Sequence, residues 1–295
     1  MKKPRILVLN PPLKLREVQK KLNSSVRLIR GNYKDIEVII VNKSVRILHK
    51  KKDMRRFDFV WISGSWSKRD IAKSISLYLS HYSCAHTLVE EGSGSSKLVD
   101  MVLFALGELP QPRSYYCISS EYSKRLNEIE IVCQFPLIAK DTRGTFGKHS
   151  FLARNSKELK RKLFQIPENI DFVFQEYIPN DFDWGIIIGG GKLLSAEKSF
   201  RNKNSESFMN HAAGGATEVF LPLEKVPEKV VTIAKQANTL LSLAWSRSDI
   251  LISSQTGKAY ILETNRSPRM TSNSMEVDAF AAYINSFLRA QSLDK

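Results

Sequence analysis

Short apolar runs typical of β-strands alternate with helix-compatible segments along this chain of 295 residues. Near the start, the strand-like runs RILVLN, IEVIIVN and DFVWISG are separated by basic segments, and IAKSISLYLSHY then has apolar residues at helical spacing. Each strand or helix must bury its apolar face against another element, so this alternation predicts layered α/β units. Because 42% of the residues are apolar, the chain can build a sizeable core divided over two or three units.

The same alternation continues through the rest of the chain. The segment EEGSGSSK, at residues 90–97, is rich in glycine and serine and predicts a domain boundary. The last element is a hairpin over 249–265, in which the turn signal SQTGK separates two apolar runs. Between them we expect helices over 95–112, 156–164 and 226–245, and strands over 129–140, 171–178 and 185–200.

The end of the last hairpin gathers oxygen-bearing side chains. Folding its two runs back on each other places Asp249 beside residues 263–265. Glu263 and Asn265 share one face of their strand, because side chains alternate between the two faces. Such hard oxygen ligands suit Mg²⁺. On the hairpin alone, an ordinary polar strand end is the better interpretation, so the metal hypothesis needs support from elsewhere in the chain.

Features that suit phosphate binding lie between the boundary and the hairpin. Lys140 ends the run FPLIAK, and the loop TRGTFGKHSF beyond it contains Gly144 and Gly147. Backbone N–H groups can approach phosphate oxygens closely at glycines, so a lysine strand followed by a glycine flap is a candidate phosphate cradle. A hairpin turn with a solvated lysine is the alternative. The motif GxxxxGK[ST] is incomplete throughout this region, which excludes a P-loop.

Cysteine and histidine usage excludes several classes of protein. Cys84, Cys117 and Cys133 are odd in number, widely spaced and without a CxxC pair, which predicts reduced, structural thiols. The five histidines show no spacing for a catalytic triad or a metal site. There is no run of about 18 consecutive apolar residues and no signal-peptide core at the start. We therefore expect a soluble, cytoplasmic protein without a membrane partner.

Positive charge is concentrated at the N-terminal end of the chain. The formal net charge is +15, yet residues 1–56 alone contain seventeen Lys or Arg and only four acids. The remaining residues have an almost balanced charge. Two interpretations carry equal weight: a solvated surface that keeps the protein soluble, and a field that attracts a polyanion or an acidic peptide.

In combination, and in this order, the segments resemble the ATP-grasp superfamily. The resemblance covers residues 95–270, and its motifs are SSKLVDMVLFALGELPQP, FPLIAK, TRGTFGKHSF, FVFQEYI, DFDWGIIIGGGKLLSAEK, NHAAGG and the last hairpin. The most similar branch is that of the RimK-type carboxylate–amine ligases, which are like glutathione synthetase. The resemblance implies a basic pre-ATP-grasp α/β domain over 1–94, a central subdomain with the lysine strand and flap over 95–178, and a C-terminal subdomain with the metal site over 179–295.

The resemblance also implies roles for individual residues. ATP would lie between the lysine strand and the hinge FVFQEYI, and the metal would lie at the end of the hairpin. The residues implied to contact the nucleotide are Lys97, Lys140, Gly144, Gly147, Glu176, Tyr177, Ile178 and Asp183. The implied metal ligands are Asp249, Glu263 and Asn265. The residues implied to take part in catalysis are Lys140, Lys198 and Asn210.

The chain departs from the family pattern at two positions on the substrate side. Gly185 stands where the strand after the hinge commonly has an arginine two residues past the aspartate. Ser63 ends the strand VWISG where many relatives place an arginine. The cations that could replace these two arginines are Lys198, Arg201, Arg266 and Arg269.

The chemistry implied by the resemblance is carboxylate activation with ATP and Mg²⁺, or Mn²⁺ in its place. ATP converts a carboxylate into an acyl phosphate, from which an amine (or a hydroxyl) displaces phosphate to form an amide (or an ester). The expected substrate is an acidic peptide or protein, or a small amino acid. Two alternatives stay open: another ATP-grasp enzyme, such as a small-molecule ligase or a kinase, and a degenerate ATP-grasp module that binds nucleic acid. Tyr33 is the single aromatic residue in 1–56, which disfavours the last alternative.

Overall fold

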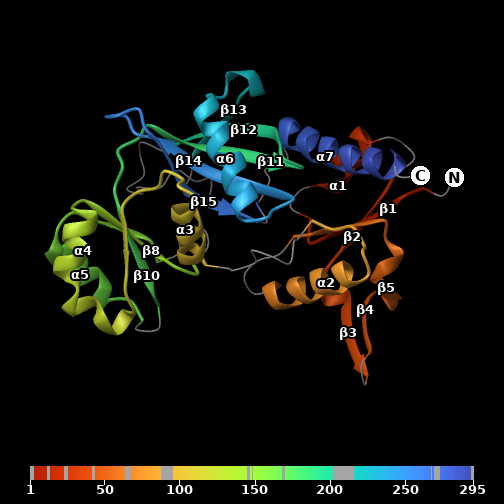
Figure 1. The fold of residues 1–295 in the computed structure, drawn as a ribbon, viewed down its shortest axis with the longest axis horizontal. Coiled ribbons are helices and arrows are strands. Elements are labelled where there is room, and N and C mark those ends of the chain that lie inside the picture. Colours follow the sequence, from red (N-terminus) through yellow and green to blue (C-terminus); the bar gives the residue numbers. More distant parts are fainter. Residues whose placement is uncertain are drawn as a thin grey trace.

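Four β-sheets organise the part of the chain that the computed structural model describes (Figure 1). A parallel and an antiparallel sheet, each of three strands, come first, followed by a four-stranded and a five-stranded antiparallel sheet. The described residues are 3–11, 14–22, 26–41, 44–63, 68–87, 96–144, 147, 149–167, 170–201, 216–266, 268 and 273–293.

The first sheet has the strand order β2-β1-β6, and its strands run parallel. Strands β1 and β6 are buried along nearly their whole length, as expected for a parallel sheet that is covered on both faces. This burial explains why both strands are continuous apolar runs in the sequence. The elements of this layer are β1 Arg5–Leu9, α1 Leu15–Lys21, β2 Arg27–Gly31, β6 Phe59–Ile62 and α2 Arg69–His81.

Helices from distant parts of the chain cover the two faces of this sheet. On one face, Val8 shares a core with α7 (Ser274–Leu293), and the ring of Trp61 stacks on Phe280 of that helix with centroids 3.9 Å apart. On the other face, Leu7 packs into a core with α2. The last helix therefore completes the core of the first sheet, a long-range contact that sequence patterns do not predict.

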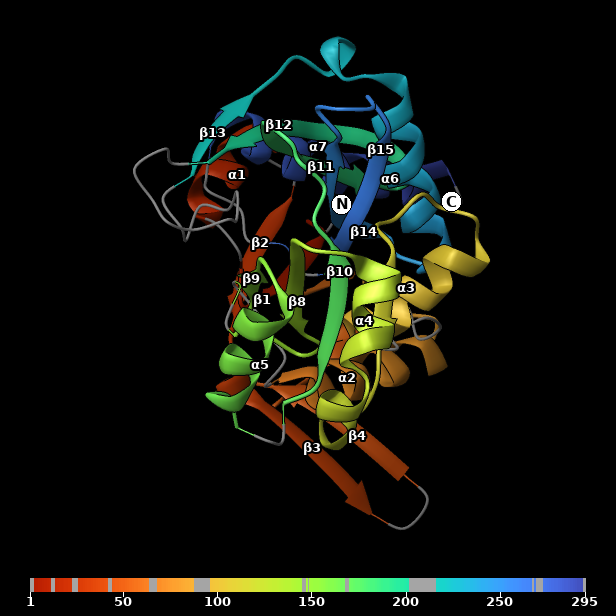
Figure 2. The same ribbon diagram turned by 90° about the vertical axis from the view of Figure 1, so that its left-hand side faces the viewer.

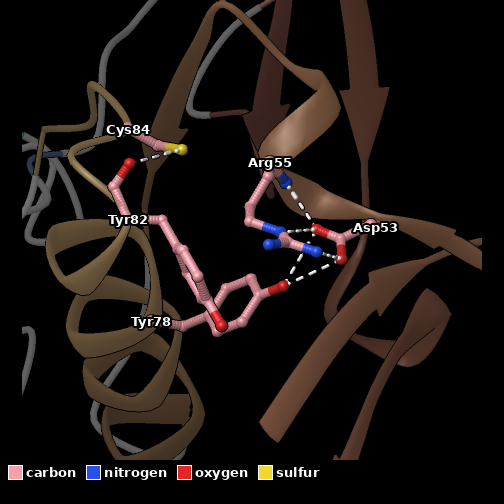
Figure 3. A network of polar contacts seen from close by, with 5 residues as sticks. All are labelled: Asp53, Arg55, Tyr78, Tyr82 and Cys84. Carbon is pink, nitrogen blue, oxygen red and sulfur yellow. Dashed lines mark hydrogen bonds and ion pairs between the residues drawn. The ribbon is translucent and has the colours of Figure 1, made fainter.

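The second sheet, β3-β4-β5, projects from the body of the molecule as a hairpin with a short third strand (Figures 1 and 2). At its base, Asp53 accepts hydrogen bonds from Arg55 Nη2 (2.8 Å) and from the Tyr78 hydroxyl (2.9 Å), which ties β5 to α2 (Figure 3). The guanidinium of Arg55 also lies 4.4 Å from the ring centroid of Tyr82. The bounds are β3 Ile36–Val41, β4 Ser44–His49 and β5 Lys52–Asp53, with 3₁₀ turns at Tyr33–Asp35 (η1) and Met54–Arg56 (η2).

The third sheet has the order β7-β10-β8-β9 and packs against α4 and α5. The expected strand over 129–140 is wrong in its first half, because that half belongs to α4. Ile129 and Cys133 are buried one helical turn apart, while Ile131 between them is 65% exposed, so the burial period is helical. The elements are β7 Ser114–Tyr116, a 3₁₀ segment Ser119–Lys124, α4 Leu126–Cys133, β8 Leu137–Asp141, β9 Phe151–Ala153, α5 Ser156–Phe164 and β10 Phe172–Glu176.

The fourth sheet has the order β13-β12-β11-β14-β15, and α6 covers one of its faces. The helix expected over 226–245 is α6, which starts directly after Pro227 and ends at Leu240, because Trp245 already begins the next strand. The bounds are β11 Phe182–Gly189, β12 Lys192–Phe200, β13 Thr217–Phe220, a 3₁₀ turn Leu223–Lys225, α6 Glu228–Leu240, β14 Trp245–Ile252 and β15 Ala259–Asn265.

Helix α3 (Lys97–Leu106) joins the third and fourth sheets, and its residue Phe104 packs into the core beneath α6. Ser96 caps this helix, since its hydroxyl accepts a hydrogen bond from the N–H of Val99 at 3.2 Å. Most of the boundary segment expected before it lies outside the described residues. The three cysteines are free, as predicted. None of the helices in the described ranges combines the length and apolar character that crossing a bilayer requires.

Candidate active site

Polar side chains form rows on one face of the five-stranded sheet. Glu197, Gly185, Asp249 and Glu263 are neighbours across β12, β11, β14 and β15 in the strand register. Alternate residues of the same strands point to the opposite face, which is apolar and packs against α6. The row from Glu197 to Glu263 therefore lies on the face of the sheet opposite to α6.

The last hairpin brings Asp249, Glu263 and Asn265 together, as expected. Asp249 and Glu263 are register partners, and Asn265 Nδ2 donates to Asp249 Oδ2 (3.2 Å) and to Glu263 Oε1 (3.3 Å). Burial raises the pKa of Asp249 to about 7; Arg247 opposes this rise, and the charge of Glu263 adds to it. Two neighbouring carboxylates repel each other when both are ionised, and a divalent cation bound between them would remove this repulsion.

The donor set of the hairpin fits Mg²⁺. Two carboxylates and an amide are hard oxygen ligands, and rotation of the Asn265 amide would turn its Oδ1 toward the pair. Within the described ranges, no three His, Cys, Asp or Glu side chains cluster in a way that could hold a metal. Water and phosphate oxygens would therefore complete the coordination, which is the usual situation for Mg²⁺ in nucleotide sites.

Lys97 and Lys140 face these carboxylates from the central part of the chain. Lys140 lies on β8, and Lys97 is the first residue of α3. Burial lowers the pKa of Lys140; Glu263 opposes this shift, and the neighbouring Lys97 adds to it. For Glu263, burial favours the neutral form, but Lys97 and Lys140 hold its pKa below the ordinary value. Positive charges from α3 and β8 thus act on one carboxylate of β15.

Lys97 also forms hydrogen bonds with the start of the glycine flap, the loop TRGTFGKHSF. Its Nζ donates a hydrogen bond to the carbonyl oxygen of Gly144, and its N–H donates to the carbonyl oxygen of Thr142 at 3.2 Å. Gly147 has a φ of 69°, a backbone conformation that glycine adopts without strain. Residues 145, 146 and 148 lie outside the described residues.

The expected adenine hinge follows β10. The N–H of Glu176 donates to Arg113 O (2.9 Å) and the N–H of Tyr177 to Pro136 O (3.3 Å). The Glu176 carboxylate accepts a hydrogen bond from Arg113 Nε at 2.9 Å. Among the described residues, the N–H of Ile178 has no hydrogen-bond partner. Its role as a hydrogen-bond donor to adenine stays a prediction.

Asp183 and Lys198 lie on opposite faces of the five-stranded sheet. Asp183 shares the polar face and accepts a hydrogen bond from Asn180 Nδ2 at 2.7 Å. Lys198 is the register partner of Trp184, and its Nζ lies 4.2 Å from the ring centroid of Phe182. The structure thus brings Asp183, but not Lys198, to the carboxylate group, because alternate residues of β12 point to opposite faces.

The other substrate-side candidates have different positions. Arg266 forms a two-point ion pair with Asp100 of α3, with N···O distances of 2.8 and 2.7 Å. This pair ties the end of β15 to the helix that begins with Lys97. Asn210 and Arg269 lie outside the described residues.

Arg247 and Glu197 are residues of this site that are not among the candidates from the sequence. Arg247 lies on β14 and Glu197 on β12. Arg247 Nη2 lies 2.5 Å from Glu197 Oε1 and 3.5 Å from Asp249 Oδ1. A Cβ atom on Gly185 would lie only 2.7 Å from Arg247 Nε and 2.8 Å from Glu197 Oε1. The glycine on β11 therefore makes room for a guanidinium from the neighbouring strand β14. The arginine within the strand WSRSDILI is a signal that the sequence contains. Its neighbours could not be named from the sequence, because they depend on the order of strands in the sheet.

A lysine-bearing antiparallel sheet that faces a second sheet ending in paired carboxylates defines an ATP-grasp protein. The family model described as the RimK-like ATP-grasp domain matches residues 95–285, and the chain belongs to this family. Both the family and the fold predicted from the sequence are confirmed: an N-terminal α/β domain precedes a two-part ATP-grasp fold.

Among curated proteins, the chain is similar to N-acetylaspartylglutamate synthase A of Homo sapiens. The two are 26% identical over 160 residues, which are 53% of this chain and 39% of the human protein. The chain therefore matches well under half of the length of this relative.

Two solved structures share the fold over the whole chain. The D-alanyl-alanine synthetase A of Vibrio cholerae has a TM-score of 0.70 at 15% identity, and the alignment covers 100% of both chains. The ATP-grasp ligase PsnB, in complex with a phosphomimetic variant of its minimal precursor, Mg and ADP, has a TM-score of 0.67 at 15% identity over 99% of both chains. At such identities, the likeness establishes the fold.

Proposed function

We propose that this protein is an ATP-dependent carboxylate–amine ligase that forms an amide bond through an acyl phosphate. The observation that carries the proposal is the pairing of Asp249 with Glu263 at the end of the hairpin, where Asn265 bridges the two carboxylates and the charges of Lys97 and Lys140 favour ionised Glu263. Two cations beside two carboxylates suit a site that must hold both a metal ion and the phosphates of ATP. Membership of the RimK-like ATP-grasp family supports the same assignment.

The two lysines and the glycine segment would bind the triphosphate. Lys140 and Lys97 provide fixed positive charge, so no reorganisation is needed when negative charge shifts between phosphate oxygens. Gly144 and Gly147 belong to a segment that would cover the phosphates and exclude water, which would otherwise hydrolyse an acyl phosphate. Because Lys97 holds the carbonyl of Gly144, movement of this segment would be coupled to phosphate binding.

The hinge and the hairpin end would bind the two ends of the nucleotide. Adenine would pack against Tyr177 and accept a hydrogen bond from the N–H of Ile178, with Glu176 and Asp183 on the nucleotide side. Mg²⁺, or Mn²⁺, would neutralise phosphate charge when it is bound. The groups that would hold it are Asp249, Glu263 and Asn265.

The reaction would proceed in two balanced steps. An oxygen of the substrate carboxylate attacks the γ-phosphorus of ATP, which forms the acyl phosphate and releases ADP. The nitrogen of an amine then attacks the acyl carbon, loses a proton and displaces phosphate, so that an amide remains. We keep Asn210 as a proposed contact to the reacting phosphate. Lys198 is not given a role in these steps, because it faces the other side of the sheet.

The proposed substrate is an acidic peptide or protein, joined to an amine that includes small amino acids as candidates. The excess of basic residues in 1–56 supports an acidic partner, and PsnB is a structural relative that was solved with a precursor peptide. The division at residues 94 and 178, which assigns the basic residues to a separate domain, is part of the proposal. So is a cytoplasmic location, which agrees with three free thiols.

The proposal is tested by trapping the acyl phosphate. The protein is incubated with Mg²⁺, ATP, hydroxylamine and a library of acidic peptides, and the products are analysed by mass spectrometry for hydroxamates. A ligase gives hydroxamates and ADP, and these are lost in the Lys140→Ala variant. Without hydroxylamine, the same peptides should form amides with added amino acids.

Two other outcomes would contradict the ligase assignment. A stable phosphorylated product that does not react with hydroxylamine would identify a kinase. Absence of ADP release with every substrate, together with tight binding of single-stranded nucleic acid, would identify a degenerate binding module instead.

A further inference from the structure

Strand β3 forms an unpaired edge of the projecting β3-β4-β5 sheet. Among the described residues it pairs only with β4, and the N–H of Lys50 donates to the carbonyl oxygen of Asp35 just before the strand. In an antiparallel pair, every second residue directs its N–H and C=O groups away from its partner strand. From the register, these residues on β3 are Ile36, Val38 and Ile40.

Apolar side chains accompany this open edge. Val38, Ile39 and Val41 are 43%, 39% and 59% exposed, although β-branched residues favour burial in a sheet. Their β4 partners nearer the base, such as Ile47, are buried against the body of the protein. A long apolar edge strand without a partner is a template for pairing with another strand.

The surroundings of the edge are strongly basic. Residues 33–56 contain eight Lys or Arg and three acids. Each of these acids is already paired, Asp35 with Lys50 (3.8 Å), Glu37 with Lys51 (2.8 Å) and Asp53 with Arg55. The positive charges that remain on this sheet include the exposed side chains of Lys34 before β3, Arg46 on the neighbouring strand β4, and Lys52 on β5 at the opposite edge.

A small cavity lies near the residues that precede this strand. It has a volume of about 310 Å³ and lies where the turn η1 meets the carboxyl ends of β1 and β2. Two lysines contribute to its wall, so it suits an acidic side chain or a terminal carboxylate. The lining residues are Asn10, Asn32, Tyr33, Lys34, Lys68 and Ile71.

We propose that an acidic peptide segment docks on β3 as an additional strand of the β3-β4-β5 sheet. Its backbone pairs with Ile36, Val38 and Ile40, its apolar side chains cover Val38 and Ile39, and its carboxylates face the surrounding lysines and arginines. The inference that this segment belongs to the substrate rests on the proposed ligase function, whereas the inference that it docks on β3 does not. Pairing of β3 with a second copy of the chain is disfavoured, because it would bring two basic surfaces together.

The test uses a fluorescein-labelled peptide of alternating glutamate and valine, with its affinity measured by anisotropy in the absence of ATP. The protein variant is Val38→Pro, which removes an outward N–H from an edge strand and leaves the β3-β4 hydrogen bonds intact. Val38→Thr is the matched control, because it reduces the apolar surface of the side chain but keeps the backbone N–H. We expect Val38→Pro to weaken binding about tenfold or more, and Val38→Thr to weaken it much less.

A second measurement does not depend on folding of the proline variant. The same peptide with two adjacent N-methylated residues lacks an N–H on either edge at that point, so wild-type protein should bind it about tenfold or more weakly than the original peptide. Exchange of Lys34, Arg46 and Lys52 for glutamine should weaken binding and flatten its salt dependence. Arg55 is left unchanged, because it holds the base of the sheet through Asp53.

Three results would overturn the docking proposal. The first is equal binding of the N-methylated and the original peptide. The second is a protein dimer in sedimentation that Val38→Pro abolishes, which would make β3 a self-association edge. The third is nucleic acid that displaces the peptide and binds Val38→Pro as tightly as wild type. Failure of the ligase assay with intact peptide docking would instead reject the proposed chemistry alone.

Discussion

The guanidinium of Arg247 reaches across Gly185 to Glu197, with 2.5 Å between Nη2 and Oε1. The two side chains come from β14 and β12, and Gly185 lies on β11 between them. Burial raises the pKa of Glu197 to about 8, and Arg247 opposes this rise. Arg247 is thus a half-buried cation that lies beside both Glu197 and the proposed metal ligand Asp249.

We predict that Gly185→Ala destabilises the protein by about 1–3 kcal/mol, because its new methyl group overlaps with the guanidinium and the carboxylate of the pair. The measurement is urea unfolding of a double-mutant cycle. In an Arg247→Ala background the same substitution should cost much less, since the guanidinium that supplies the two closest atoms is then absent. Equal costs of Gly185→Ala in the two backgrounds would show that the close approach has no energetic effect.

The carboxylate pair leads to a prediction about metal ions. Asp249→Asn removes one of two neighbouring carboxylates, so thermal stability in EDTA should be retained or increased, while the stabilisation that Mg²⁺ gives to the wild type should disappear. ATP turnover should fall about a hundredfold or more. The control is Asp181→Asn at an exposed turn nearby. A Mg²⁺-dependent rise in melting temperature that persists in Asp249→Asn would reject the metal site.

The lysine strand and the hinge should contribute to nucleotide binding in different ways. Lys140→Ala removes charge at the phosphates, so calorimetry should show a loss of ATP affinity of about tenfold or more with unchanged adenosine affinity. Tyr177→Ala removes packing against the base and should weaken both ligands. Lys192→Ala, at the exposed start of β12, serves as the charge control. Adenosine binding that falls equally in Lys140→Ala and Tyr177→Ala would contradict this placement of ATP.

Local patterns in the sequence predicted those parts of the site that depend on short-range geometry. The turn between β14 and β15 makes this pairing local, so Asp249 could be placed beside residues 263–265 by counting. The exact pairing with Glu263 depends on a register shift between Asp249 and Ile250, which the sequence does not show. The stretch from Ile129 to Cys133 was assigned wrongly, because a short apolar run fits a strand or a helix until its burial is known.

Long-range strand order determined the parts that the sequence did not predict. Arg247 meets Glu197 only because β11 lies between β12 and β14, an arrangement that local periodicity does not specify. Lys198 lies away from the carboxylates for a related reason: its face depends on which side of the sheet α6 covers. Packing of α7 on the first sheet likewise joins residues from opposite ends of the chain.

His49, at the base of the projecting sheet, should make stability depend on pH. Its side chain is 4% exposed, and Nε2 lies 4.0 Å from Asp35 Oδ2. Burial lowers the pKa of His49 below its ordinary 6.5; Asp35 opposes this shift, and Lys50 and Arg56 add to it. The unfolded chain therefore binds a proton near this pH more readily than the folded protein does, so the contribution of His49 to stability is present above about pH 6.5 and is lost as the pH falls.

We predict that wild-type protein loses more stability between about pH 7 and pH 5 than His49→Gln does, because glutamine has no proton to bind in this range. The measurement is the free energy of unfolding in urea at both pH values. His81→Gln, at an exposed position near the end of α2, is the control and should retain the pH dependence of the wild type. Identical pH dependence in wild type and His49→Gln would mean that His49 becomes protonated equally well in the folded and the unfolded chain.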